Sequence, residues 1–343
     1  MHEMKRILVI APAWIGDMIM AHTFFQLLKR ENPQSIIDVV APAATLPLTK
    51  RMPEISTAFD LRIGHKKLSL GTRYRLGKLL RKNHYEQAII LPNSIKSALL
   101  PLFAKIPLRS GFLGEHRYFL LNDIRDLDKS LKMFQRYASL AFKAHSALPS
   151  ELPHPRFSID KKHQQQTLQQ LQLKLDKPIL VLCPGAEYGR AKRWGLEYFA
   201  KLAVHYTQQG WQVWILGGPN DVTPAHTIQQ FSQHQCINLV GKTKLLDAID
   251  LLSLAKVAVT NDSGLMHMAA ALDIPLVALY GSSSPEHTPP LSKKAKILWL
   301  HLFCSPCFKR ECPLSGNDHM RCLIDITPVM VQSAISELLE KVG

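Results

Sequence analysis

The fold class of this chain is indicated near its N-terminus, by Arg6-Ile-Leu-Val-Ile-Ala-Pro-Ala-Trp-Ile-Gly-Asp17. Its first part, residues 6–11, is a short apolar run that is typical of a buried parallel strand. Proline and glycine then mark a turn, and the amphipathic pattern of residues 18–30 predicts a helix directly after it. Strand, loop and helix in this order form the repeating unit of a parallel α/β sheet.

The same alternation recurs along the chain. In the first half it predicts further strands at 36–41, 87–91 and 109–112 and helices at 74–82 and 129–145. In the second half it predicts strands at 179–183, 212–216, 237–240, 257–260 and 276–279, and helices at 195–209, 222–233, 245–253, 265–272 and 328–341. No repeat of about 20–50 residues is visible, which argues against a solenoid. The pattern predicts two parallel α/β sheets.

The segment Leu148-Pro-Ser-Glu-Leu-Pro-His-Pro155 separates the two halves. Three prolines in this segment sustain neither a helix nor a central strand, so it is interpreted as a linker. A length of 343 residues fits two domains of roughly 100–200 residues each. We therefore expect one Rossmann-like domain at 1–150 and a second at 151–326. The terminal helix at 327–343, with Thr327 as its N-cap, is expected to pack back toward the N-terminal domain.

Composition narrows the functional classes. Apolar residues make up 46% of the chain and charged residues 20%, which is ordinary for a globular protein. No stretch approaches the ~20 apolar residues of a membrane helix, and the N-terminus lacks a secretion signal, so a cytoplasmic location is expected. The formal net charge is +15, and residues 1–150 hold 23 basic but only 11 acidic side chains. This imbalance indicates a polyanionic partner or, alternatively, a solvated basic face.

Gly16 and Asp17 lie in the loop after the first predicted strand. Ligands of parallel α/β folds bind at this edge of the sheet, where the helix that follows presents backbone N–H groups. Asp17 is the only carboxylate of the loop, so it is a candidate general base for a substrate hydroxyl. Alternatively, it caps the helix. The loop lacks the pattern Gly-x-Gly-x-x-Gly, which disfavours an NAD-dependent dehydrogenase.

A second loop, Cys183-Pro-Gly-Ala-Glu-Tyr-Gly-Arg-Ala-Lys-Arg-Trp194, follows the first strand of the second half. Its glycines allow close approach of the backbone to a ligand, and its cationic side chains suit phosphate groups. These residues are Gly185, Gly189, Arg190, Lys192 and Arg193. The order of a P-loop is not met, and a surface loop with incidental basic residues is the alternative.

Asp262, Ser263 and Gly264 follow another predicted strand and open a helix. Free N–H groups at a helix start suit a pyrophosphate, and the helix dipole adds to the attraction. His267 lies one turn further on, where it either points back to the same anion or is a satisfied, partly buried histidine. Asp221 follows a neighbouring strand and is a candidate acceptor for a ribose hydroxyl. The serines of residues 281–288 add hydroxyl donors to the same rim.

Together these motifs resemble the bacterial lipopolysaccharide heptosyltransferases of glycosyltransferase family 9. The resemblance rests on Ile-Gly-Asp17, Pro184-Gly-Ala…Ala191-Lys-Arg-Trp194, Asn261-Asp-Ser-Gly-Leu-Met-His267 and Cys304-Ser-Pro-Cys-Phe-Lys-Arg-Glu-Cys-Pro-Leu314. It spans nearly the whole chain, and the tail is most similar to the members that add the second heptose. Gly195 departs from the pattern, because the family usually has proline there. The resemblance implies a glycosyltransferase B-type fold, in which two Rossmann-like domains face each other across a central cleft.

The resemblance also implies an inverting transfer of L-glycero-D-manno-heptose from ADP-heptose onto the inner-core heptose of lipopolysaccharide. Asp17 would then be the general base, and Lys192 would neutralise the departing ADP without a divalent metal or another cofactor. The implied donor-binding residues are Gly185, Glu187, Lys192, Arg193, Asp221, Leu245, Asp262, Ser263, Gly264 and His267.

The acceptor of such enzymes, a lipid A–Kdo–heptose core, is anionic and lies in the inner leaflet of the inner membrane. The basic N-terminal half is therefore expected to bind both the acceptor and the cytoplasmic face of this membrane, peripherally and electrostatically. Gly16, Arg62, Lys66 and Lys67 are the expected acceptor-binding residues.

Cys304, Cys307, Cys312 and Cys322 have the number and, for the first pair, the spacing of a zinc site. The heptosyltransferases that the chain resembles are not known as metalloproteins. We therefore expect no metal here and four reduced thiols in a packed loop.

Two other functions stay open. The first is transfer of the first heptose to Kdo, because acceptor choice resides in the weakly patterned N-terminal half. The second is nucleic-acid binding, which predicts aromatic side chains among the basic ones. Residues 61–84 contain only Tyr74, so no nucleic-acid partner is expected.

Overall fold

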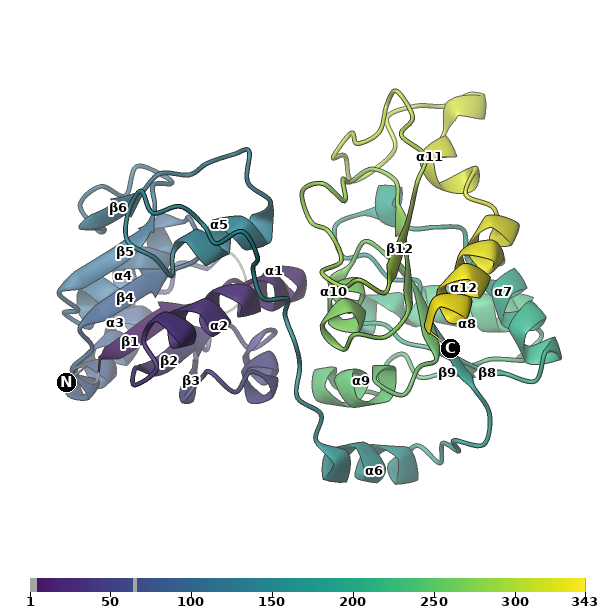
Figure 1. The fold of residues 1–343 in the computed structure, drawn as a ribbon, viewed down its shortest axis with the longest axis horizontal. Helices are drawn as coiled ribbons and strands as arrows, with labels where there is room; N and C mark the ends of the chain where they lie inside the picture. Colours follow the sequence, from purple (N-terminus) through teal and green to yellow (C-terminus); the bar gives the residue numbers. More distant parts are fainter. Residues whose placement is uncertain (1–4, 64–66, 343) are drawn as a thin grey trace. The chain divides into compact units, whose positions relative to one another are not determined.

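The computed structural model describes residues 5–63 and 67–342 and divides into two compact units, Met1–Ser158 and Ile159–Gly343 (Figure 1). The first unit contains β1 (Arg6–Ile10), α1 (Ile15–Met20), α2 (His22–Glu31), β2 (Ile36–Ala41), β3 (Thr57–Asp60), α3 (Leu70–Leu80), β4 (Gln87–Ile90), α4 (Ile95–Phe103), β5 (Leu108–Phe112), β6 (Asp123–Arg125) and α5 (Met133–Ser139). Its strands form one parallel sheet in the order β3-β2-β1-β4-β5-β6.

The second unit repeats this plan. It contains α6 (Lys161–Gln170), β7 (Ile179–Cys183), α7 (Leu196–Gln208), β8 (Gln212–Ile215), α8 (Val222–Phe231), β9 (Ile237–Asn238), α9 (Leu245–Leu252), β10 (Val257–Asn261), α10 (Gly264–Ala271), β11 (Leu276–Tyr280), β12 (Ala295–Trp299), α11 (Arg321–Ile324) and α12 (Pro328–Val342). Its sheet is also parallel, in the order β12-β11-β10-β7-β8-β9.

Counted from the start of each unit, both sheets have the strand order 3-2-1-4-5-6 of the Rossmann fold. The predicted α/β class with two Rossmann-like domains is therefore confirmed. In such sheets the strand order reverses between the first and fourth strands, and ligands bind outside the carboxyl ends of these two strands. The switch points are β1/β4 in the first unit and β7/β10 in the second.

The central strands form where the sequence is continuously apolar. Every residue of β7, β10 and β11 is buried, as expected for strands that are covered on both faces. In the first unit, Val9 of β1 pairs in register with Val39 of β2 and Ile89 of β4, so three β-branched side chains form one row across the sheet.

The boundary between the two units and the position of the terminal helix differ from those expected from the sequence. The first unit extends to Ser158 because the linker is bound to it. The Thr23 hydroxyl donates to the Pro153 carbonyl at 2.9 Å, and the Arg156 N–H donates to His22 Nδ1 at 3.3 Å.

The helix α12 does not form a separate C-terminal segment. Its apolar face, including Val331 and Ile335, belongs to the hydrophobic core of the second unit, and it packs beside α7 (Figure 1). As predicted, Thr327 caps this helix, since its hydroxyl accepts from the Met330 N–H at 3.4 Å.

Two predicted helices have different bounds in the structure. The pattern at 18–30 corresponds to two helices, α1 and α2, which are separated at Ala21. The helix expected at 129–145 is limited to α5. After Ser139 the N–H groups of Leu140 and Ala141 bond to carbonyls three residues back, which tightens and ends the helix.

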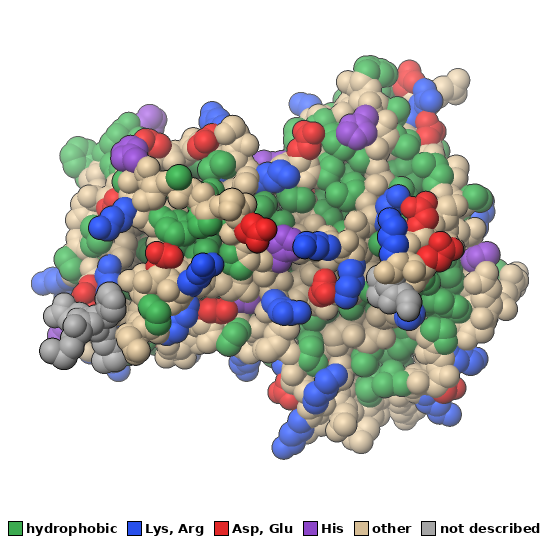
Figure 2. All heavy atoms as spheres, viewed as in Figure 1, with side chains coloured by type: hydrophobic (Ala, Val, Ile, Leu, Met, Phe, Trp, Pro, Cys, Tyr) green, Lys and Arg blue, Asp and Glu red, His purple; other side chains and the backbone are tan. Residues whose placement is uncertain are grey.

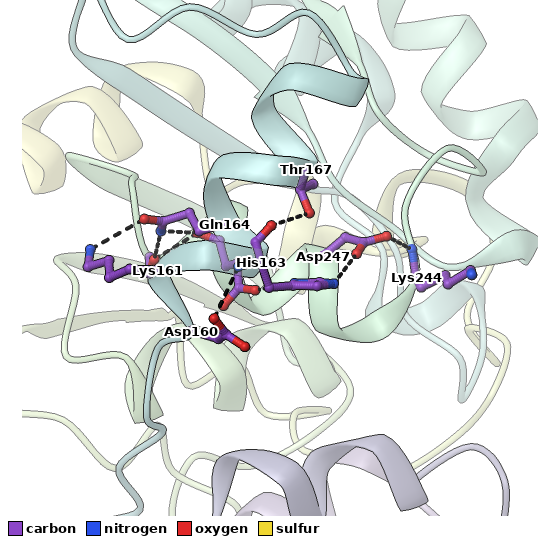
Figure 3. A network of polar contacts seen from close by, with 9 residues as sticks. Asp160, Lys161, His163, Gln164, Thr167, Lys244 and Asp247 are labelled. Carbon is purple, nitrogen blue, oxygen red and sulfur yellow. Dashed lines mark hydrogen bonds and ion pairs between the residues drawn. The ribbon is translucent and has the colours of Figure 1, made fainter.

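The helix α6 was not predicted, because its sequence Lys-Lys-His-Gln-Gln-Gln-Thr-Leu-Gln-Gln has no apolar stripe. Polar contacts dock it on α9 instead (Figure 3). His163 of α6 lies 2.6 Å from a carboxylate oxygen of Asp250 through Nδ1 and 3.4 Å from one of Asp247 through Nε2. The Gln164 amide donates to the Asp250 carbonyl and to the Ser253 hydroxyl, both at 2.8 Å.

Two surface properties bear on partners. Among residues 5–63 and 67–342, no helix is long and apolar enough to cross a bilayer. On the face of the molecule that Figure 2 draws, Lys and Arg side chains are interspersed with Asp and Glu and form no continuous basic patch among the described residues.

We predict that His163→Ala destabilises the second unit by roughly 1–3 kcal/mol, because the buried Asp250 carboxylate loses its imidazole partner. Urea unfolding of the whole chain, followed by a probe in the second unit, measures the effect. His205→Ala, which removes a histidine hydrogen-bonded to exposed Gln209, is the matched control. Equal stability of the two variants would contradict the docking role of His163.

Candidate active site

The loop of residues 184–194 crosses the carboxyl end of β7, and Asn261 at the end of β10 fixes both of its ends. The Asn261 amide donates to the Pro184 carbonyl at 2.7 Å, and its oxygen accepts from the Trp194 N–H at 3.1 Å. Trp194 is buried, and its indole N–H donates to the Ile326 carbonyl at 2.7 Å. These contacts hold the loop at the switch point of the second sheet, although sequence reasoning assigned Asn261 no role.

Lys192, at the end of this loop's 3₁₀ turn, forms an ion pair with Asp262. The Lys192 ammonium lies 2.5 Å from Asp262 Oδ2, and the two side chains are 18% and 5% exposed. Ser263 precedes α10 in an extended conformation, and Gly264 is the first residue of the helix. A cation distant in sequence is therefore held beside the residues that precede the N-terminus of a helix, an arrangement that suits a phosphate group.

His267 lies one turn into α10 and is 5% exposed. Burial lowers the pKa of its imidazole to about 4, and the nearby Lys192 adds to this effect while Asp262 opposes it. The ring is therefore neutral near pH 7. It can position a sugar or phosphate by hydrogen bonding, but it does not supply a positive charge.

Asp221 belongs to the loop after β8 and packs against the loop after β7. Its Oδ2 accepts from the Gly218 N–H at 2.8 Å, and burial raises the pKa of the carboxyl group. A Cβ atom on Gly185 would lie 2.2 Å from the same oxygen. Gly185 is thus required for the two loops to touch, which is a structural reason for glycine beyond contact with a ligand.

The remaining predicted donor residues lie along the same edge of the sheet. Glu187 is exposed, and both of its carboxylate oxygens are 3.2 Å from the Asn220 amide nitrogen. Arg193 donates twice to the Ala186 carbonyl, at 3.2 and 3.1 Å, so its guanidinium group shapes the loop. Leu245 is the half-buried first residue of α9. The structure therefore places predicted donor residues after β7, β8, β9 and β10, which are neighbours in the sheet.

Several buried hydroxyl groups line this region without a partner. Among the described residues, no hydrogen bond is found for the hydroxyls of Ser263, Ser282 and Ser283. Ser282 and Ser283 are only 1% and 3% exposed. An unsatisfied buried hydroxyl costs about 1–3 kcal/mol, so each of these groups requires a partner, which a bound ligand can supply. The run of three serines after β11 was the only sequence signal for Ser282 and Ser283.

The four C-terminal cysteines lie together. Cys304, Cys307, Cys312 and Cys322 line a cavity of about 50 Å³. Burial, followed by the other three thiols, raises the pKa of Cys322 to about 11. In the described part of the chain, no group of three or more His, Cys, Asp and Glu side chains is arranged to hold a metal ion.

The first unit contains a cavity of about 520 Å³ at the carboxyl ends of its strands. Residues after β1, β2 and β4 line it, and so do Asp17 and Tyr137. Burial and then the charge of Asp17 raise the pKa of Tyr137 well above its usual value, so the phenol stays protonated. Asp17 is the third residue of α1 rather than its N-cap, which is Trp14. A general-base role and a favourable interaction with the start of the helix are both compatible with this position.

Cationic side chains surround this cavity. Lys67, predicted to bind the acceptor, lines it together with Arg73, Lys96 and Arg136, of which the last two were not singled out from the sequence. Arg73 is buried, and burial lowers the pKa of its guanidinium group. Arg62 is exposed and does not line the cavity, nor does Gly16, although both adjoin residues that do. Lys66 lies outside the described residues.

Known proteins resemble this chain over most of its length. The family model of glycosyltransferase family 9 (heptosyltransferase) matches residues 73–317. The chain belongs to this family. It is 45% identical to lipooligosaccharide heptosyltransferase 2 of Haemophilus influenzae, over 98% of the chain and 99% of the relative. It is 43% identical to lipopolysaccharide heptosyltransferase 2 of Salmonella typhimurium, with the same coverage.

A solved structure extends the likeness to the fold. The structure of Escherichia coli ADP-heptose lipopolysaccharide heptosyltransferase II superposes with a TM-score of 0.87 at 42% identity, covering 98% of this chain and 99% of that one. The glycosyltransferase B-type class that the sequence motifs implied is thereby confirmed, and the chain is a family 9 glycosyltransferase.

For this family member we predict that the His267 ring titrates near pH 4, because its charged form is disfavoured in the folded state. The unfolded chain takes up this proton near pH 6.5, so the stability that His267 contributes is complete above pH 6.5 and decreases as the pH falls toward 4. Histidine ring NMR of the folded chain, assigned with His267→Gln, measures the midpoint. A midpoint near 6.5 would refute the neutral, buried state.

Proposed function

We propose that this chain is an inverting glycosyltransferase that moves L-glycero-D-manno-heptose from ADP-heptose onto the first heptose of the lipopolysaccharide inner core. The observation that carries the proposal is the Lys192–Asp262 ion pair beside the start of α10, at the switch point of the second sheet. A cation and N–H donors in this combination stabilise the charge that develops on a leaving diphosphate. Identities of 43–45% over the full chain with heptosyltransferases 2 support the sugar and the second-heptose step.

The donor binds to the second unit in this proposal. Lys192 and the N–H groups of Ser263 and Gly264 bind the diphosphate, and the unpartnered hydroxyl of Ser263 adds a donor. Asp221 and Leu245 hold the ribose and the adenine, while Asp262 and His267 orient the heptose or the phosphate. Glu187, Gly185 and Arg193 shape the loop around them.

The reaction is an in-line displacement. The acceptor hydroxyl oxygen forms a bond to the anomeric carbon while the bond from this carbon to the β-phosphate oxygen breaks, and its electron pair leaves with ADP. Asp17 accepts the hydroxyl proton as general base, which typically contributes about 10²–10⁴-fold to the rate. Lys192 stabilises the charge that develops on ADP, and because this charge is larger in the transition state than in the bound donor, the contact accelerates the chemical step.

The acceptor binds to the first unit in this proposal. Among the described residues, the cavity that holds Asp17 is lined by the cationic side chains of Lys67, Arg73, Lys96 and Arg136, which suit an anionic glycolipid core. Arg62, Gly16 and Lys66 contribute at or near its rim. The basic N-terminal half also attracts the anionic cytoplasmic leaflet of the inner membrane, so the enzyme associates with it peripherally and less tightly as salt rises. The proposal includes no nucleic-acid partner.

The experiment that tests this function offers the purified chain ADP-heptose with two acceptors, one ending in Kdo and one ending in heptose. ADP release with the heptose-terminated acceptor, and little with the other, is expected. Faster release with the Kdo-terminated acceptor would instead assign the first-heptose reaction, and no release with either would overturn the proposal.

We predict that Asp17→Asn lowers kcat by about 10²–10⁴-fold, because the acceptor hydroxyl loses its proton acceptor. The Kd for ADP should stay within about twofold of its original value, since ADP affinity is assigned to the other unit. Steady-state kinetics and calorimetry give the two quantities. Asp176→Asn, an exposed aspartate that accepts from Gln212, is the control and should change neither. A large loss of ADP affinity in Asp17→Asn would count against the base role.

A further inference from the structure

Tyr188 places an aromatic ring beside the cation that the proposed reaction needs. The Lys192 ammonium lies 5.3 Å from the centre of the Tyr188 ring, within the range of a cation–π interaction. The guanidinium carbon of Arg310 lies at the same distance from this ring. The Tyr188 hydroxyl donates to the Phe308 carbonyl at 2.9 Å, a contact that links residues 120 positions apart.

The segment of residues 305–310 also contacts Tyr188. The Ser305 hydroxyl donates to the Gly281 carbonyl at 2.6 Å, and the Phe308 N–H donates to the Ser282 carbonyl at 2.7 Å. The segment is therefore fixed to the chain that leaves β11. It is also fixed to the loop of Lys192, because the Ala191 N–H donates to the Arg310 carbonyl at 3.0 Å.

The contact between this segment and the Lys192 loop is very close. A Cβ atom on Gly189 would lie 2.3 Å from the Arg310 carbonyl oxygen and 2.7 Å from its Cα, so glycine is required there. Phe308 has a φ of +52°, a left-handed conformation that is costly for a bulky residue. Both peptide groups of Phe308 are hydrogen-bonded, to Ser282 and Tyr188, and these bonds hold it in that conformation.

From this geometry we infer that Tyr188 is a positioning residue for Lys192, and that residues 305–310 hold Tyr188 in place. The inference rests on the proposed function, in which Lys192 binds the diphosphate. A lysine side chain without neighbouring contacts samples many rotamers. The ring of Tyr188 limits Lys192 to rotamers that keep its ammonium group near Asp262 and the start of α10. The segment of residues 305–310 thus has a role in the donor site that requires no thiol chemistry.

A double-mutant cycle on the full chain tests this inference, with the Kd for ADP as its readout. Tyr188→Leu removes the ring and is expected to raise this Kd by about threefold to fivefold, the size of an exposed cation–π contact. Tyr188→Phe keeps the ring and loses only the bond to Phe308, so a smaller rise, about twofold, is expected. Tyr118→Leu, at a tyrosine of similar exposure in the first unit, is the control and should change nothing.

The decisive comparison repeats Tyr188→Leu in a Lys192→Met background, with weak binding followed by ligand-observed NMR. If Tyr188 acts through Lys192, its replacement there costs no further affinity. An equal loss in both backgrounds, or no loss in the original chain, would overturn the positioning role while leaving the proposed function intact. If Lys192→Met alone binds ADP as tightly as the original chain, the assignment of Lys192 fails and this inference fails with it.

Discussion

Lys192 and Asp262 follow neighbouring strands, β7 and β10, and their ion pair joins the two loops at the point where the strand order of the second sheet reverses. Asp262 is nearly buried, so removal of Lys192 would leave its charge uncompensated. The pair also keeps the lysine beside the first N–H groups of α10. Asn261 and Trp194 fix the ends of the loop, and Tyr188 contacts the lysine, so the surrounding structure specifies where this one cation lies.

The two units share a topology and differ in chemistry. In the second unit, the carboxyl edge of the sheet carries glycines, hydroxyls and helix N–H groups, which suit a diphosphate. In the first unit, the same edge encloses a cavity whose described lining includes a carboxylate, a protonated phenol and several cationic side chains, which suit an anionic acceptor with a hydroxyl to be deprotonated. The proposed division of work, with the nucleotide bound by the second unit and the acceptor by the first, rests on these different loops on one scaffold.

The sequence predicted the strands and helices best where their residues are uniformly buried. It predicted them least well where polar side chains, or contacts between residues far apart in the chain, hold the structure. The strand β7, in which every residue is buried, has the predicted bounds. The helix α6 was not predicted, because hydrogen bonds rather than an apolar stripe hold it in place. Asp17, Lys192 and Asp262 were singled out from the sequence because they lie in the segments that connect predicted strands to the helices after them. The contact of Tyr188 with Phe308, and the place of Lys96 and Arg136 in the cavity of the first unit, could not be predicted from the sequence. Only the folded chain brings such separate segments together.

A crystal structure of the chain with ADP tests the central claim most directly. Our account predicts the diphosphate within hydrogen-bond distance of the Lys192 ammonium and of the Ser263 and Gly264 N–H groups, with the ribose near Asp221 and the adenine near Leu245. A nucleotide bound in the cavity of the first unit, or anywhere away from the β7/β10 edge, would contradict it.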